Sequence, residues 1–186
     1  MIKNILILVG VITVFFSCTK NNEFLIEKGR VGPVTKTTKI KDLESVFQKD
    51  SIVPILKKAD SEEEQESYFK GDDKYLIYEK GGKHLLTIIP MEETDSSTIK
   101  SVEIFDNRYK TKKGISLYSP YKDINIAYNL SITNTILSAH IDIDELNATM
   151  SIDKNDIGIN EFNRDEIKPD QIPDLAKIKH FTIWFN

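Results

Sequence analysis

Runs rich in β-branched and aromatic residues predict most of the regular structure in this chain. Segments 75–80 and 83–89 flank the pair Gly81-Gly82. Glycine readily adopts the positive φ values of a tight turn between strands, so this pattern predicts a β-hairpin. A further run of the same kind predicts a third strand at 99–105.

Helical spacing appears ahead of these strands. Apolar residues at positions 40, 43, 46 and 47 lie on one side of a helix, which predicts an amphipathic helix over 40–47. Thr38, just before it, has a hydroxyl that fits an N-cap. The acidic run 60–66 that follows is predicted to be a solvated loop or frayed helix rather than a metal cluster.

The second half of the chain repeats the first. Segment 121–128 aligns with 40–47, and Ser119 takes the place of Thr38 as the capping hydroxyl. Segment 178–184 aligns with 99–105, and 139–144 and 147–152 predict a second hairpin between them. Chance similarity between short amphipathic pieces is the alternative explanation. We interpret the pattern as a duplication, with units at about 30–106 and 107–186.

Each unit is then a helix followed by three antiparallel strands. The predicted fold class is α+β, with both units in one sheet and the helices on one face. This order, with Gly32 and Lys113-Gly114-Ile115 shortly before each helix, resembles the tandem units of β-lactamase-inhibitor-type proteins and small outer-membrane assembly lipoproteins. The resemblance covers the single predicted domain, 30–186, and carries over no functional residue.

The N-terminus has the pattern of a secretory signal. Lys3 precedes an apolar run over 5–16, and a small residue, Ser17, stands directly before Cys18. The run is too short for a membrane-spanning helix, which needs roughly 20 apolar residues. Segment 15–18 resembles the lipobox of bacterial lipoproteins in its relaxed, Bacteroidetes-type form, and the whole chain resembles uncharacterised lipoproteins of such bacteria. Residues 1–17 are the predicted signal peptide, and 18–29 the lipidated cysteine with its tether.

The lipoprotein resemblance implies where in the cell the protein is located. In that family the cysteine sulfur receives a diacylglycerol and the freed amine usually a third chain, such as palmitate. Several acyl chains hold a protein stably on a membrane, whereas one chain binds only marginally. Thr19 does not resemble the inner-membrane retention signal, so we expect the outer membrane of a Gram-negative bacterium. Whether the protein faces the periplasm or the exterior is left open.

Charge and composition limit the classes of binding partner that we expect. The formal net charge is -4 at pH 7, and removal of Lys3 with the signal peptide makes it -5. Lysines are interleaved with acidic residues rather than gathered on one stripe, so nucleic acid is not an expected partner. Cys18 is the only cysteine, which leaves no disulfide framework.

Catalytic and metal-binding patterns are weak. No activated nucleophile, paired carboxylates or metal motif has usable spacing, so we predict a protein that is not an enzyme and needs no cofactor. Alternation places His140, Asp142 and Asp144 on one sheet face. These three residues form a less favoured candidate metal site. His140 and Asp142 are also the candidate catalytic residues of a less favoured alternative, a surface hydrolase.

A recognition surface is the stronger hypothesis. Alternation in the last strand turns Phe181, Ile183 and Phe185 toward the helices, leaving the other face to the predicted interaction residues His180, Thr182 and Trp184. The repeat adds Phe105 and Glu103 to this face. Exposed aromatic anchors with polar neighbours favour protein recognition, although the loop 153–173 could instead cover them.

The sequence therefore predicts a lipid-anchored binding module of the cell envelope. Its partner would be a protein or another envelope component, and an inhibitor or immunity role is one form of this function. A subunit of an envelope-assembly complex is the alternative.

Overall fold

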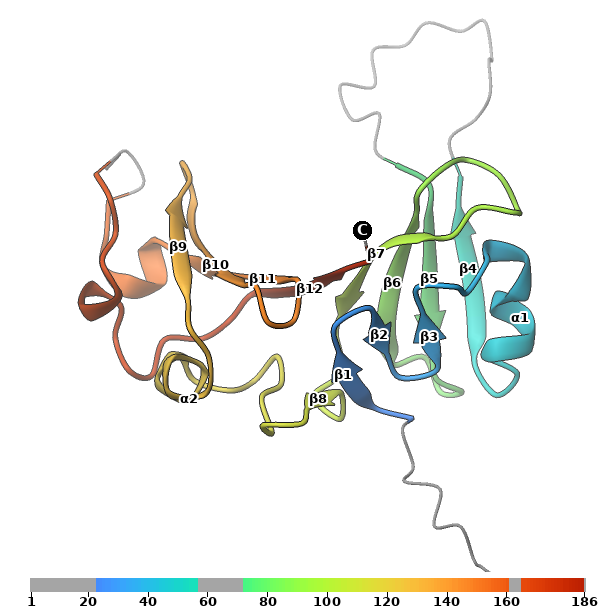
Figure 1. Ribbon diagram of the computed structural model, residues 1–186, viewed down its shortest axis with the longest axis horizontal. Helices are drawn as coiled ribbons and strands as arrows, with labels where there is room; N and C mark the ends of the chain where they lie inside the picture. Colours follow the sequence, from blue (N-terminus) through green and yellow to red (C-terminus); the bar gives the residue numbers. More distant parts are fainter. Residues whose placement is uncertain (1–22, 57–71, 161–164, 186) are drawn as a thin grey trace, which may run out of the picture.

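The computed structural model describes residues 23–56, 72–160 and 165–185 (Figure 1). Within these residues, twelve strands form an eight-stranded and a four-stranded sheet. The predicted signal peptide, Cys18 and the acidic run 60–66 lie outside the described residues. In the part that is described, no helix is long and apolar enough to span a bilayer.

The large sheet is antiparallel throughout, with the strand order β4-β5-β6-β7-β12-β11-β10-β9. Each half is a run of strands paired with their neighbours in sequence, and the halves meet where β7 pairs with β12. The strands are β4 (Ser51–Ile55), β5 (Lys74–Tyr78), β6 (His84–Pro90), β7 (Ile99–Ile104), β9 (Ser131–Asn134), β10 (Ser138–Ile143), β11 (Ala148–Asp153) and β12 (His180–Trp184).

The predicted α+β class is wrong, because the fold is mostly β. The first helical segment is a 3-10 turn, η1 (Ile40–Asp42), followed by α1 (Leu43–Val46), and α2 (Tyr121–Ala127) is the longer of the two α-helices described. Four strands of the large sheet, rather than three, follow each helix. Both predicted hairpins are present, as β5–β6 and β10–β11, and the strands predicted at 99–105 and 178–184 are β7 and β12.

The extra strands, β4 and β9, are the edges of the large sheet. Most residues of β4 are exposed, and Pro54 lies within it. Proline lacks the N–H of a ladder hydrogen bond and is confined to edge positions, so it weakened the sequence signal for a strand. In β9 the exposed residues are Ser131 and Thr133, which gives that strand no strong apolar face either.

A small sheet was also missed in the sequence. It has the order β3-β2-β1-β8 and comprises β1 (Leu25–Glu27), β2 (Arg30–Val31), β3 (Val34–Thr35) and β8 (Lys110–Thr111). Strand β8 pairs parallel to β1, and it joins the segment before the first helix to the segment after β7. Strands of two or three residues are too short for alternation to reveal them.

The predicted helix caps are wrong as well. Lys39 and Pro120 occupy the N-cap positions, and neither makes a side-chain capping bond. The Thr38 hydroxyl instead accepts a hydrogen bond from the Thr35 N–H at 3.0 Å. The Ser119 hydroxyl accepts one from the Ser116 N–H, also at 3.0 Å. Both hydroxyls therefore stabilise turns that lead into the helices.

The core lies on one face of the large sheet. Alternate strand residues are fully buried there, among them Ile77, Leu86, Val102, Ile141, Met150, Phe181 and Ile183. Helix residues Leu43 and Ile124 belong to the same cluster, so the helices cover this face. Figure 1 shows α1 and the small sheet beside β4–β7, and α2 beside β9–β12. We call the opposite side of the large sheet the open face.

Candidate functional site

The predicted interaction residues meet at the centre of the open face. Strands β7 and β12 are neighbours, with Thr182 opposite Glu103 and Trp184 opposite Ser101. Burial alternates along β12: Phe181 and Ile183 are buried, whereas Thr182 and Trp184 are partly exposed and His180 is exposed. Residues far apart in sequence thus form one surface across the junction of the two halves.

Trp184 is held in place by hydrogen bonds. Its indole Nε1–H donates to the Thr149 hydroxyl at 3.1 Å, and that hydroxyl donates to Asp142 Oδ1 at 2.8 Å. The Asn147 side-chain amide donates to the Trp184 carbonyl at 3.0 Å. The bond to Thr149 restricts the ring, which remains partly exposed, and the bond from Asn147 fixes the backbone of Trp184.

Phe105 is part of an aromatic row that the sequence did not reveal. Its ring stacks on the His84 imidazole with centroids 3.9 Å apart, and His84 stacks on Tyr78 at 4.8 Å. A β-bulge creates this row: Leu86 pairs with Ile77, but His84 pairs with Tyr78, so Leu85 is the extra residue. Strict alternation would have turned His84 toward the core.

The His84 imidazole also makes polar contacts with its own strand. Its Nε2 lies 3.1 Å from both the Leu86 carbonyl and the Thr87 hydroxyl. Burial lowers the pKa of His84, although the bond to the Leu86 carbonyl and the charge of Glu103 act in the opposite direction. Burial between the two rings therefore disfavours the charged form of the imidazole.

A histidine–carboxylate pair lies between the aromatic residues. His180 Nδ1 is 2.6 Å from Glu103 Oε1, and the side chains are 65% and 27% exposed. The pair is accessible, which suits contact with a partner. The open face thus carries two ring systems with polar groups between them.

The less favoured metal residues do not converge. Asp142 accepts the Thr149 hydrogen bond, Asp144 lies in the exposed turn after β10, and His140 lies opposite Ser151 and Thr133. Within the described ranges, no group of three or more potential ligands could hold a metal ion.

The loop 153–173 packs with the core, as far as the structure describes it. Ile157, Ile167 and Ile172 join the same buried cluster as α2. The segment that follows pairs with the start of this helix, where the Tyr121 N–H donates to the Ala176 carbonyl at 3.1 Å. These contacts place it with the helix side of the molecule rather than over the open face.

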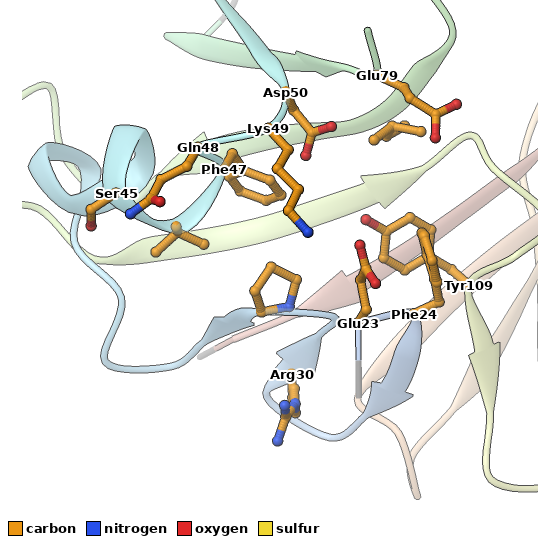
Figure 2. Close-up of a pocket in the computed structure, with 13 residues that line it drawn as sticks. Glu23, Phe24, Arg30, Ser45, Phe47, Gln48, Lys49, Asp50, Glu79 and Tyr109 are labelled. Carbon is orange, nitrogen blue, oxygen red and sulfur yellow. The ribbon is translucent and has the colours of Figure 1, made fainter. Parts of the chain in front are cut away.

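A pocket of about 530 Å³ lies on the core side, between the small sheet, the end of α1 and the β5–β6 turn (Figure 2). We call it the Tyr109 pocket. Its walls combine apolar and charged side chains. The residues used below are Glu23, Phe24, Arg30, Phe47, Lys49, Asp50, Glu79, Leu85 and Tyr109. Sequence reasoning missed this site because its lining comes from five separate segments with no motif in common.

Carboxylates crowd this pocket. Burial raises the pKa of Asp50, and the negative charges of Glu79 and Glu23 raise it further. Tyr109 is 2% exposed, and burial also raises the pKa of its phenol, with Asp50 as the next cause. The Phe24 ring meets the Tyr109 ring edge to face, with centroids 5.1 Å apart.

An ion-pair network supports the pocket wall. Arg108 donates from Nη1 to Glu79 at 2.7 Å and from Nη2 to Asp106 at 2.7 Å. Its guanidinium carbon lies 4.6 Å from the centroid of the Phe24 ring. Arg108 thereby links the residue after β5 to the segment after β7 and to the residue before β1.

These features define a mostly β protein in which an eight-stranded antiparallel sheet has a helix-covered face and an open face. The structure is similar to the crystal structure of the uncharacterized protein yfeY from Escherichia coli, with a TM-score of 0.52 and 13% sequence identity. The similarity covers 86% of this chain and 98% of that one, and it concerns the fold alone. No protein-family model and no curated protein matches the sequence. The resemblance to inhibitor-type and assembly lipoproteins therefore stays a prediction.

Proposed function

We propose that this protein is a lipid-anchored binding module of the cell envelope, and that its open face recognises a protein partner. The observation that supports the proposal best is the presence of two immobilised ring systems outside the core. Trp184 is restrained by Thr149, and Phe105 by its stack on His84. Rigid aromatic side chains lose little conformational entropy on binding, which makes them effective interface anchors.

The spacing of the anchors favours a protein over a small molecule. Trp184 lies opposite Ser101, so it is four strand positions from the level of Phe105, or about 13 Å. Thr182 and the pair His180–Glu103 lie between them and offer hydrogen-bonding groups. A protein interface commonly covers about 800 Å² on each partner, which spans such a distance. The lipid attachment rests on the sequence around Cys18.

Partner capture from a detergent extract of the cell envelope tests this proposal. Trp184→Ala and Phe105→Ala should each reduce recovery of the partner at least about tenfold, as for interface anchors worth more than 1.4 kcal/mol. Tyr118→Ala is the matched control, because this ring is 69% exposed and lies in the segment that leads into α2. Circular dichroism should show that all three variants remain folded.

The outcome separates the two candidate functions. A free protein that captures its partner only on mixing supports the binding module, and a complex of fixed stoichiometry already present in mild detergent indicates an envelope-assembly subunit. Equal partner recovery by wild type, Trp184→Ala and Phe105→Ala would remove the open face from the recognition surface.

A further inference from the structure

The Tyr109 pocket brings three carboxylates, Glu23, Asp50 and Glu79, close to two cationic side chains, Arg30 and Lys49. Within the described part of the chain, the carboxylates of Glu23 and Asp50 make no hydrogen bond or ion pair. Glu79 is already paired with Arg108. Arg30 also borders the pocket, but it donates to the Gly32 carbonyl at 2.9 Å, and Figure 2 shows its guanidinium directed away from the carboxylates.

The Tyr109 hydroxyl is a second, independent feature. The side chain is 2% exposed, and Figure 2 shows its oxygen directed into the pocket between Glu23 and Asp50. Among the described residues this hydroxyl has no hydrogen-bond partner. The oxygen itself opens into the pocket rather than being enclosed by protein, so a partner for it has to come from the pocket. A polar group of a ligand would supply the missing partner.

Apolar side chains complete the lining. Phe24, Phe47 and Leu85 border the same space as the carboxylates. Pockets for small molecules combine mostly apolar walls with a few convergent polar groups, in volumes of roughly 300 to 1,000 Å³. The volume of about 530 Å³ lies within this range. The walls are suited to a ligand that has a short carbon chain and a positively charged end.

We infer that the Tyr109 pocket binds a primary ammonium group carried on a short aliphatic chain. The ammonium donates hydrogen bonds to the carboxylates of Asp50 and Glu23 and to the Tyr109 oxygen, while the carbon chain lies against Phe24 and Leu85. An ammonium has three donors, which matches these three acceptors. This site is separate from the open face, so it goes beyond the binding function proposed above.

The Lys49 amine competes with a ligand ammonium for the same carboxylates. Its side chain borders the pocket, and Figure 2 shows its amine directed into the same space. No residue in the described ranges forms an ion pair with it. Its positive charge partly offsets the carboxylates and opposes the entry of a second cation. Removal of this charge should therefore strengthen binding of an amine.

Isothermal titration calorimetry of the purified protein with 1,5-diaminopentane tests the inference, with pentane-1,5-diol as the uncharged matched probe. The diamine should bind and the diol should not. Asp50→Asn and Tyr109→Phe should each weaken binding by roughly tenfold, the factor that corresponds to a charged or buried hydrogen bond. Lys49→Met should strengthen it, whereas Lys122→Met, at a distant ion pair with Asp174, should leave it unchanged.

Stability measurements separate a ligand contact from a structural role. Tyr109→Phe should unfold at the wild-type temperature in the absence of diamine, because its hydroxyl has no internal partner to lose. Several results would overturn the inference: no heat with millimolar diamine, equal binding of the diol, or diamine affinity unchanged in Asp50→Asn or Tyr109→Phe. Binding of calcium in preference to the diamine would also overturn it, since it would make the carboxylates a metal site.

Discussion

Asp106 is a fully buried carboxylate whose charge is compensated by neighbouring cations. Arg108 donates to it from its backbone N–H at 2.9 Å and from Nε and Nη2, and Lys83 forms an ion pair with it at 2.9 Å. Burial alone would raise the pKa of Asp106. The hydrogen bonds from Arg108 and Lys83 outweigh burial and lower the pKa to about 2.

We expect Asp106→Asn to lower the free energy of unfolding by about 3 kcal/mol, because it leaves Arg108 without its main buried counter-charge. Urea denaturation at pH 7 measures this change. Asp174→Asn is the matched control: its ion pair with Lys122 is solvent-exposed, and such pairs contribute less than about 1 kcal/mol. Equal effects of the two substitutions would contradict the role assigned to Asp106.

The same carboxylate makes stability depend on pH. The pKa of Asp106 is lowered to about 2 in the folded protein, from an ordinary value of 3.8. Its contribution of about 2 kcal/mol is therefore present above pH 3.8 and is lost as pH falls toward 2. The unfolding free energy of Asp106→Asn should fall less steeply with acid than that of wild type over this interval. Parallel curves would contradict the assignment.

At the level of single residues, the sequence predicted side-chain direction wherever a strand is regular. Alternation correctly separated Phe181 and Ile183 from Thr182 and Trp184. It could not reveal His84 in the aromatic row, because a bulge shifts the alternation by one position. The position of the Tyr109 hydroxyl in a pocket could not be predicted either, because segments far apart in the sequence form that pocket.

Gly32 determines the conformation of the turn between β2 and β3. It lies between β2 and β3 with φ of +56°. A Cβ at this position would lie 2.4 Å from the Glu23 carbonyl oxygen and 3.0 Å from the Tyr109 ring. Only glycine combines this backbone conformation with so close an approach. The tight turn of the small sheet therefore sets the position of two residues of the Tyr109 pocket.

We expect Gly32→Ala to destabilise the fold by about 2 kcal/mol or more, because it adds a backbone clash to left-handed strain. Gly29→Ala is the matched control in the same sheet: it has φ of +69° but an ordinary nearest contact of 3.9 Å, so strain alone should cost about 1 kcal/mol. Thermal unfolding compares the two. A smaller effect at Gly32 than at Gly29 would contradict this account.

Element by element, the sequence predicted the central strands and missed the peripheral ones. Strands β5, β6, β10 and β11 bury one face and are joined in pairs by short turns, which leaves a clear pattern. The edge strands and the small sheet have no such pattern, because exposure or shortness removes the alternation. Both predicted helical segments are present, as η1 with α1 and as α2, and each ends one residue before its predicted end. They are only one or two turns long, so they do not make the fold α+β.

On the scale of the whole molecule, the proposed anchor sets where the open face and the Tyr109 pocket operate. We expect Cys18→Ser to lose palmitate labelling and to move from the membrane fraction to the soluble fraction, because several acyl chains provide stable attachment. Thr19→Ser leaves the thiol in place and should stay in the membrane fraction. Palmitate incorporation into Cys18→Ser would contradict lipidation at this residue.

The sequence by itself determined the local features: two hairpins, the strands β7 and β12, and the direction of their side chains. These depend on turn glycines and on the period of two along a strand, both of which are properties of short segments. Tertiary structure alone decided that β7 pairs with β12, that edge strands and a second sheet make the fold mostly β, and that Tyr109 faces Asp50 across a pocket. Such long-range contacts depend on how separate segments pack together, and no single segment carries that information.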